Sequence, residues 1–508
     1  MSSVSLLALA SLACIALALC AMLFKFLYVP LGSSAKASSS PPELQLPASK
    51  ITELFFGERF EFIRDGFKAT SSSIYQLTLF RRKAIVLSGE EGRELFLREK
   101  GLSIYDSFSI LLGSNTAQFN IHQVNAIIKR IISMQRPENL QPMIPLVLST
   151  CERNMDSWGT QTILDPCSSI HEITFQTMMS NAFFDIANDP AMSSRLKTLV
   201  DIVDSPANPY STWFSWLPNT LMFRKIISAV RMFRIVQKAL KSRKSSGVRR
   251  NDVVQQMLDN GDSTIQIFGV CSADSLLPTN TDLLKFILGL SLAGARATGT
   301  IGQFCTVTIH NRNLTDTTAV SWLIMQLSSN PEWSTAVQEE IKVLTTTQDT
   351  STETLSTIPL QAWETQTPIL DRCIRETLRT SQPYTAMRRN TGPDITMKGY
   401  TIPSGSLVVY PFLDTSINPA YYGEPLRWDP SREAKKEFIS WGAGKHGCKG
   451  QRLAVLNMKL VAASILCRFD ISLVDAVGAK METAPVPDWN DSVTCRPMNV
   501  GGILLVRK

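Results

Sequence analysis

The sequence predicts a mainly α-helical protein with small β-sheets. After Cys448, apolar residues recur at three- and four-residue steps and mark one face of a helix: Leu453, Leu456, Leu460, Ala463 and Cys467. Stretches with strand-like alternation are short, as at Tyr75–Leu79. With 508 residues, of which 44% are hydrophobic, the chain can bury a large core in one or two domains.

The N-terminal region has the composition of a membrane anchor. Val4–Phe24 is apolar and uncharged, close to the ~20 residues that cross a bilayer. Lys25 and Lys36 follow it and no positive side chain precedes it, so the positive-inside rule predicts a cytosolic main domain. Ten cysteines without regular spacing fit a reducing compartment. We expect an anchor at 1–29, a Ser- and Pro-rich linker at 30–49 and the main domain at 50–508.

The elements of the main domain are predicted from local patterns, and most of them are helical. We expect a short helix at Phe60–Gly66, then strands at Tyr75–Leu79 and Lys83–Ser88. An irregular stretch precedes a helix that contains Arg130. Met222–Arg250 is basic and amphipathic, which suits either an ordinary surface helix or one that faces a membrane. Two further strands are expected at Gly399–Pro403 and Ser406–Tyr410.

The most informative segment is Trp441–Gly450, which reads W-G-A-G-K-H-G-C-K-G and opens the C-terminal helix. Gly444 and Gly450 would allow positive φ and a close approach of the backbone to a flat macrocycle. The helix N-terminus and the basic residues Lys445, His446 and Lys449 would favour an ionised Cys448 sulfur. A thiolate in such a loop is suited to be an axial ligand of haem iron.

Three other interpretations of this segment exist. Gly442–Gly447 also matches G-x-G-x-x-G, with Asp470 near the place of a ribose-binding acid, but too little chain follows to complete a doubly wound sheet. A zinc site is disfavoured because the chain has only four histidines and no second cysteine at ligand spacing. A buried structural cysteine is the ordinary state of a lone Cys, and only agreement with distant motifs argues against it.

Those distant motifs are a charged pair and a turn. Glu376 and Arg379 lie three residues apart, so they share one helix face; such a pair is most often a solvated surface pair. Trp428–Arg432 (W-D-P-S-R) supplies a second arginine. Pair, strands, turn and cysteine loop together resemble the cytochrome P450 family, in its fungal, membrane-anchored form, over about residues 50 to 508. The resemblance implies that Glu376, Arg379 and Arg432 form a buried structural triad.

The same resemblance implies haem b with Cys448 as its thiolate ligand, in a loop whose signature positions are Trp441, Gly444, His446 and Gly450. Tryptophan at the first of these replaces the usual phenylalanine. His446 and one of Arg388 or Arg389 would pair with the haem propionates, and Arg130 is a further candidate. Residues 50–508 would then be a haem-thiolate catalytic domain.

The oxygen-activating helix of that family carries A-G-x-(acid)-T-(T/S), and here the element is split. Ala293 and Gly294 begin it, yet the acid and threonine occur only at Asp316 and Thr317. Joining Ala295 to Asp316 restores A-G-A-D-T-T. Our hypothesis is that 296–315 is a translated intron, with a genuine surface loop as the alternative. If every mature transcript contains these codons, the intron hypothesis fails. In the family, the acid and threonine steer protons to iron-bound dioxygen.

The resemblance implies a monooxygenase, an oxidoreductase that uses O2 and NADPH-derived electrons from a flavin-containing NADPH-cytochrome P450 reductase. The expected substrate is an apolar small molecule, typically hydroxylated in fungal secondary metabolism such as terpenoid or alkaloid tailoring. The expected location is the endoplasmic reticulum membrane, single-pass, with a cytosolic catalytic domain. Basic residues around the cysteine loop suit an acidic electron donor, whereas a net charge of +7 is too dispersed to indicate nucleic acid. A haem isomerase or dehydratase without a redox partner and a non-catalytic haem-binding membrane protein are the alternatives.

Overall fold

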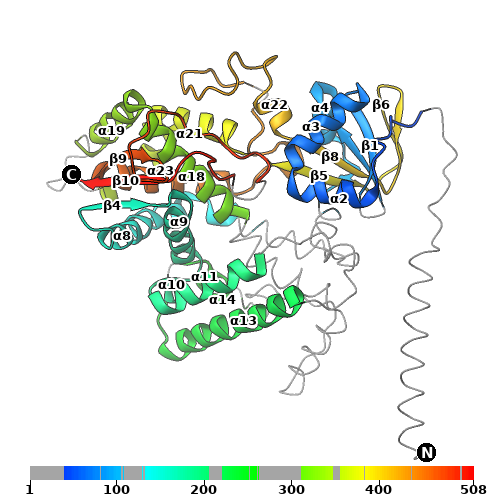
Figure 1. Cartoon of the computed structure of the whole chain (residues 1–508). Helices are drawn as coiled ribbons and strands as arrows, with labels where there is room; N and C mark the ends of the chain where they lie inside the picture. Colours follow the sequence, from blue (N-terminus) through cyan, green and yellow to red (C-terminus); the bar gives the residue numbers. More distant parts are fainter. Residues whose placement is uncertain are drawn as a thin grey trace, which may run out of the picture.

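The computed structural model describes residues 39–79, 82–104, 107, 129, 132–204, 220–250, 252–259, 261, 311–346, 355–382, 384–435, 438–491 and 495–508. In these residues the protein is mainly helical with small sheets, which confirms the predicted fold class (Figure 1). None of the helices within these ranges has the length and apolar character that a bilayer span requires. The predicted anchor segment Val4–Phe24 lies outside them.

The described helices run through the whole chain. They are α2 (Ala48–Gly57), α3 (Arg59–Thr70), α4 (Gly89–Arg98), α7 (Pro137–Leu140), α8 (Met143–Asp156), α9 (Pro166–Ala182), α10 (Phe184–Ala187), α11 (Pro190–Asp204), α13 (Thr220–Ser246), α14 (Val253–Asp259), α18 (Asn311–Ser329), α19 (Pro331–Thr346), α20 (Leu360–Thr365), α21 (Pro368–Thr380), α22 (Leu413–Ser416) and α23 (Gln451–Arg468), with 3₁₀ turns η2 (Leu355–Thr357) and η3 (Gly444–His446). The predicted Phe60–Gly66 helix is confirmed within α3, and α2 begins at Ala48, inside the stretch expected to be linker.

A five-stranded sheet is the largest β element of the described chain. Its order is β1 (Ile74–Leu79), β2 (Arg82–Leu87), β8 (Leu407–Pro411), β5 (Thr385–Asn390) and β3 (Leu102–Ser103). β2 and β8 pair in parallel and the other neighbours are antiparallel. A second sheet has the order β4 (Gln161–Leu164), β10 (Gly502–Arg507) and β9 (Phe469–Val474), and β6 (Ile395–Met397) pairs with β7 (Tyr400–Ile402). The predicted strands around residues 75–88 and 399–411 are confirmed.

The two faces of the five-stranded sheet contact different elements. Met387 packs with α2 and α3 on one face. Ala386 and Val408 pack with Phe96 of α4 and with Ala443 of the cysteine loop on the other. Successive side chains of a strand point to opposite faces, so Arg388 shares the face of Ala386, whereas Arg389 shares that of Met387.

α23, which follows the cysteine loop, lies in the main helical core. The sequence predicts one apolar stripe on this helix, whereas nearly every residue from Leu453 to Leu466 is buried. The helix is enclosed because it packs against α8, α18, α19 and α21. Even Lys459 is buried, and its ammonium group donates to the Trp363 carbonyl and Thr367 hydroxyl, each at 2.8 Å. The middle of α23 is thereby fixed relative to α20 and the start of α21.

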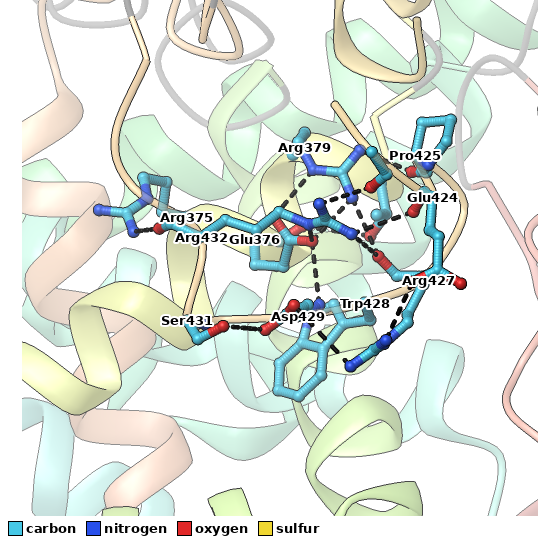
Figure 2. Close-up of polar contacts among 12 residues, drawn as sticks. Arg375, Glu376, Arg379, Glu424, Pro425, Arg427, Trp428, Asp429, Ser431 and Arg432 are labelled. Carbon is cyan, nitrogen blue, oxygen red and sulfur yellow. Dashed lines mark hydrogen bonds and ion pairs between the residues drawn. The ribbon is translucent and has the colours of Figure 1, made fainter. Parts of the chain in front are cut away.

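Glu376 of α21 is the centre of a buried charge network (Figure 2). Arg379 donates to both of its carboxylate oxygens, at 2.8 and 2.7 Å. Arg432 donates to the same carboxylate at 3.2 Å, and the Asp429 amide does so at 3.0 Å. The side chains of Glu376 and Arg379 are 4% and 2% exposed, so their mutual pairing is needed to offset the cost of burying two charges.

The two arginines also bind the irregular backbone that follows α22. Arg379 donates to the carbonyls of Ser416 and Pro425 at 2.6 and 2.7 Å. Arg432 donates to the carbonyls of Gly423 and Glu424 at 2.6 and 3.0 Å. Segment 416–432 contains no long regular element, so these guanidinium groups take the place of a hydrogen-bonded ladder. They hold the chain that leads into the cysteine loop against α21.

Replacing Glu376 by Gln should destabilise the protein strongly. The substitution leaves Arg379 buried without a carboxylate, and breaking one side of a buried ion pair typically costs about 3–5 kcal/mol. Urea denaturation monitored by circular dichroism measures the change in the free energy of unfolding. Glu424→Gln is the matched control, because Glu424 pairs with Arg427 at the exposed surface at 3.0 Å and should cost less than about 1 kcal/mol. Equal losses in the two variants would contradict a special role for Glu376.

Candidate functional site

Cys448 lies in a loop whose backbone is held by short-range hydrogen bonds. Its amide donates to the Trp441 carbonyl at 2.8 Å, which closes the loop around residues 442–447. The Trp441 side chain packs against the main helical core at the base of the loop. The Cys448 side chain is exposed, and it lies ahead of α23, which begins at Gln451. This arrangement presents one sulfur from a fixed backbone at the start of a buried helix.

Glycine is required at two places in this loop, and only one of them, Gly444, was expected. Gly444 has φ +64°, as predicted, and a Cβ built on it would lie 2.8 Å from the Leu97 carbonyl oxygen of α4. Gly442 also has positive φ, at +67°. Gly450 has φ −114°, an ordinary value, so the expectation of positive φ there is wrong. Local sequence does not distinguish these glycines, because the close approach at Gly444 depends on contact with α4.

Arg388 carries a buried positive charge beside the loop. It is 4% exposed, its guanidinium lies 4.4 Å from the centre of the Phe96 ring, and it donates to the Phe96 carbonyl. Within the part of the chain that the structure describes, it forms no ion pair with a carboxylate. Burial lowers the pKa of Arg388 to about 10, so the group still carries its charge at neutral pH.

His446 and Lys445 belong to the same cationic cluster. His446 Nε2 lies 3.2 Å from the Leu102 carbonyl oxygen, and Lys445 donates to the Lys100 carbonyl at 2.5 Å. Burial and the charge of Arg388 lower the pKa of His446 to about 4 and also lower that of Lys445. His446 is therefore neutral at pH 7, and the expectation that it adds positive charge near the sulfur needs correction. An anion bound here would be stabilised by the charges of Arg388 and Lys445, and it would raise the pKa of His446.

The remaining predicted site residues fall into three groups. Glu376, Arg379 and Arg432 meet in the network of Figure 2, away from direct contact with the loop glycines. Arg389 is half-buried, with its Nε atom unbonded, and it shares the α2–α3 face of the sheet, so Arg388 is the arginine beside the loop. Asp316 and Thr317 lie in α18, which begins at Asn311 and so includes residues 311–315. Arg130, Ala293 and Gly294 lie outside the described residues.

The donor set fits haem. A haem carries two propionate carboxylates and an iron that accepts a thiolate. Arg388 is a buried cation without a carboxylate partner among the described residues, and Cys448 is an accessible sulfur on the loop that Arg388 adjoins. Burying a charge without a counter-charge is costly, so a site of this kind is expected to bind an anion.

Replacing Gly444 by Ala should destabilise the protein by about 2 kcal/mol or more. Left-handed backbone costs a non-glycine residue roughly 1–2 kcal/mol, and the new Cβ would in addition collide with the Leu97 carbonyl oxygen. Gly399→Ala is the control, because Gly399 has φ +78° but nothing within 4 Å of the added Cβ. Urea denaturation of both variants separates the two contributions. If Gly399→Ala costs as much as Gly444→Ala, the approach to α4 is unimportant.

Comparisons with known proteins agree with this geometry. The family model described as Cytochrome P450 matches residues 314–488, which include the charge network and the cysteine loop. The cytochrome P450 monooxygenase AacuE of Aspergillus aculeatus is 23% identical, over 84% of this chain and 84% of its own. The cytochrome P450 monooxygenase dmxR5 of a Cryptosporiopsis species is 24% identical, over 84% of this chain and 82% of its own.

A solved structure has the same fold. The retinoic acid-bound cyanobacterial CYP120A1 superimposes with a TM-score of 0.63 at 19% sequence identity, covering 92% of this chain and all of its own. Fold, motif order and relatives therefore agree with the prediction made from the cysteine loop. The family match, the fungal relatives and the shared fold together support the cytochrome P450 monooxygenases, a family of oxidoreductases, as the family that this chain resembles.

Proposed function

We propose that the chain binds haem b through the Cys448 thiolate and hydroxylates an apolar small molecule in fungal secondary metabolism. The observation that carries the proposal is the pairing of an accessible cysteine with a buried cationic cluster. Arg388 would bind a haem propionate, and His446, once protonated beside that anion, would bind it as well. Bound haem would supply activation of dioxygen, and the protein residues would hold it and steer protons.

Protein residues around the cofactor would have distinct tasks. Gly444 lets the cysteine loop approach α4, so that the loop packs beside the strand that carries Arg388. Thr317 and Asp316, on α18, are our candidates for delivering protons. Ala293 and Gly294 would precede them in one helix if 296–315 were absent. The chemistry of Asp316 and Thr317 suits proton delivery, because a carboxylate and a hydroxyl on adjacent residues can pass a proton through water. The join of Ala295 to Asp316, with 296–315 as a translated intron, remains part of this proposal.

Substrate, partner and location complete the proposal. The fungal relatives AacuE and dmxR5 are named as monooxygenases, and CYP120A1 was solved with retinoic acid bound, which favours an apolar small molecule. The W-G-x-G-x-H cysteine loop resembles that of fungal family members that often tailor terpenoids or alkaloids, and this resemblance is the basis for proposing such a substrate. The exposed cations Lys445 and Lys449 beside Cys448 suit an acidic flavin reductase fed by NADPH. The apolar segment Val4–Phe24 supports a single-pass anchor in the endoplasmic reticulum with a cytosolic catalytic domain.

The carbon-monoxide difference spectrum of the reduced full-length chain tests the proposal. We expect a thiolate-type Soret band, because Cys448 would remain the iron ligand after reduction. Cys448→Ala should lose the band. Cys467→Ala, which removes an exposed cysteine from the far end of α23, should keep it. Absence of the band from the full-length chain and from a chain lacking 296–315 would contradict haem-thiolate ligation.

Deleting 296–315 tests the interrupted helix. We expect the shortened chain to keep the thiolate-type band and to couple NADPH consumption to product more efficiently, because Asp316 and Thr317 would follow Ala295 directly. The measurement is the ratio of hydrogen peroxide released to NADPH consumed, with a flavin reductase supplied. If deletion abolishes the band that the full-length chain shows, the segment is a genuine part of the fold.

A further inference from the structure

A surface cavity reaches Cys448 from the side of α20 and α23. Its volume is about 530 Å³. It is bounded by the loop cysteine, by Glu364 of α20, by Arg452 in the first turn of α23 and by Gln135 ahead of α7. Solvent in this cavity would approach the sulfur, so the groups that close its walls affect the environment of the thiolate.

The guanidinium group of Arg452 connects the residues on the different sides of this cavity. Arg452 Nε and Nη2 donate to the two carboxylate oxygens of Glu364, at 2.5 and 2.9 Å. Arg452 Nη1 donates to the Gln135 carbonyl oxygen at 2.6 Å. The hydrogen bonds to Glu364 raise the pKa of Arg452. A planar guanidinium is suited to such a bridge, because its donors are fixed in one fork.

The bridge continues to the residue that follows Cys448. The Gln135 side-chain amide donates to the carbonyl of Lys449. A peptide group is planar, so holding the Lys449 carbonyl also fixes the direction of the Gly450 N–H on the same plane. The contacts from Glu364 through Arg452 and Gln135 therefore end on the peptide between Lys449 and Gly450, one residue beyond Cys448.

The Arg452–Glu364 ion pair is partly exposed, which limits its contribution to the stability of the protein. Arg452 and Glu364 side chains are 40% and 30% exposed, and an isolated surface pair of that kind adds little stability. We expect this pair to matter instead for the position of the cysteine loop, because it joins three segments that are far apart in sequence beside the Cys448 sulfur. Removing the guanidinium would free the Lys449 peptide without removing any residue of the loop.

We propose that Glu364, Arg452 and Gln135 are positioning residues that form a clamp on the Lys449 peptide and keep Cys448 directed at the haem iron. The inference rests on the proposed haem-thiolate function and deepens it. The clamp restricts movement of the cysteine loop toward the cavity, and so protects the iron–sulfur bond against protonation by solvent. We assign these residues a positioning role and no direct contact with substrate or haem.

The test uses the full-length holoenzyme and its Arg452→Met variant. Arg452→Met keeps much of the side-chain length and removes the donors. In mild urea, conversion of the thiolate-type carbon-monoxide band to the thiol-type band should be about tenfold faster in this variant, the effect of losing one charge-assisted hydrogen bond. The iron reduction potential should shift to more positive values, because a less firmly held thiolate donates less charge.

Three further variants make the result specific. Arg452→Lys keeps the charge but not the fork, and should convert nearly as fast as Arg452→Met. Adding Glu364→Gln to Arg452→Met should produce no further change, since both act in one unit. Arg249→Met is the matched control: Arg249 pairs with Asp259 at 2.6 Å, far from the loop in the chain, and its loss should leave the conversion rate and the potential unchanged.

The outcomes separate the clamp from the function beneath it. If the unmodified chain shows no thiolate-type band, the proposed function has failed and the clamp fails with it. If the unmodified chain shows the band and Arg452→Met matches it in conversion rate and potential, the clamp alone is overturned. If Arg452→Met fails to bind haem, Glu364→Gln, which preserves shape, decides: an unchanged rate overturns the proposal and a faster rate supports it.

Discussion

The buried charge of Arg388 is the constraint on which the site depends. A guanidinium that is 4% exposed, with no carboxylate partner among the described residues, is costly to bury unless another anion balances it. The strand β5 carries it to the face of the sheet that contacts α4 and the cysteine loop. A cofactor with two carboxylates and an iron would satisfy the cation and the sulfur together, which a zinc ion or a dinucleotide would not.

A second charge network holds the chain that leads into the cysteine loop. Glu376 and Arg379 join α21 to the irregular chain between α22 and the cysteine loop, and Arg432 contributes from the far end of that chain. Lys459 fixes α23 to α20 and α21 in the same way. Buried ionic groups of this kind are a poor source of stability but tolerate only one arrangement, because each lost partner leaves a charge unpaired. The loop between the two networks therefore has little freedom to move.

Local pattern was sufficient for the motifs and for several elements. The spacing of Glu376 and Arg379 on one helix face and the strands around Tyr75–Leu79 could be predicted because those features depend on neighbouring residues. Features set by tertiary contact could not. Gly442 and Gly444 have positive φ whereas Gly450 does not, and at Gly444 the Leu97 carbonyl also leaves no room for a Cβ. The choice of Arg388 over Arg389 likewise required the faces of the sheet.

The role of Arg452 shows the same limit more sharply. From the sequence, Arg452 is only one of several basic residues near the cysteine, suited to a charged surface. Its contacts with Glu364 and Gln135 come from segments distant in the chain, and nothing in the local pattern indicates them. Family resemblance supplied the haem, the thiolate and the triad, whereas the geometry supplied the partners that hold them. The two kinds of inference are therefore complementary in this chain.

The central claim is that the Arg388 charge is balanced by haem carboxylates, and esterified haem tests it most directly. The measurement compares how fast the protein loses haem and haem dimethyl ester to an acceptor globin. We predict that the ester is lost about tenfold faster, as expected for one charge-assisted hydrogen bond, and that the difference largely disappears in Arg388→Met. Equal retention of haem and its ester by the unmodified protein would contradict the account.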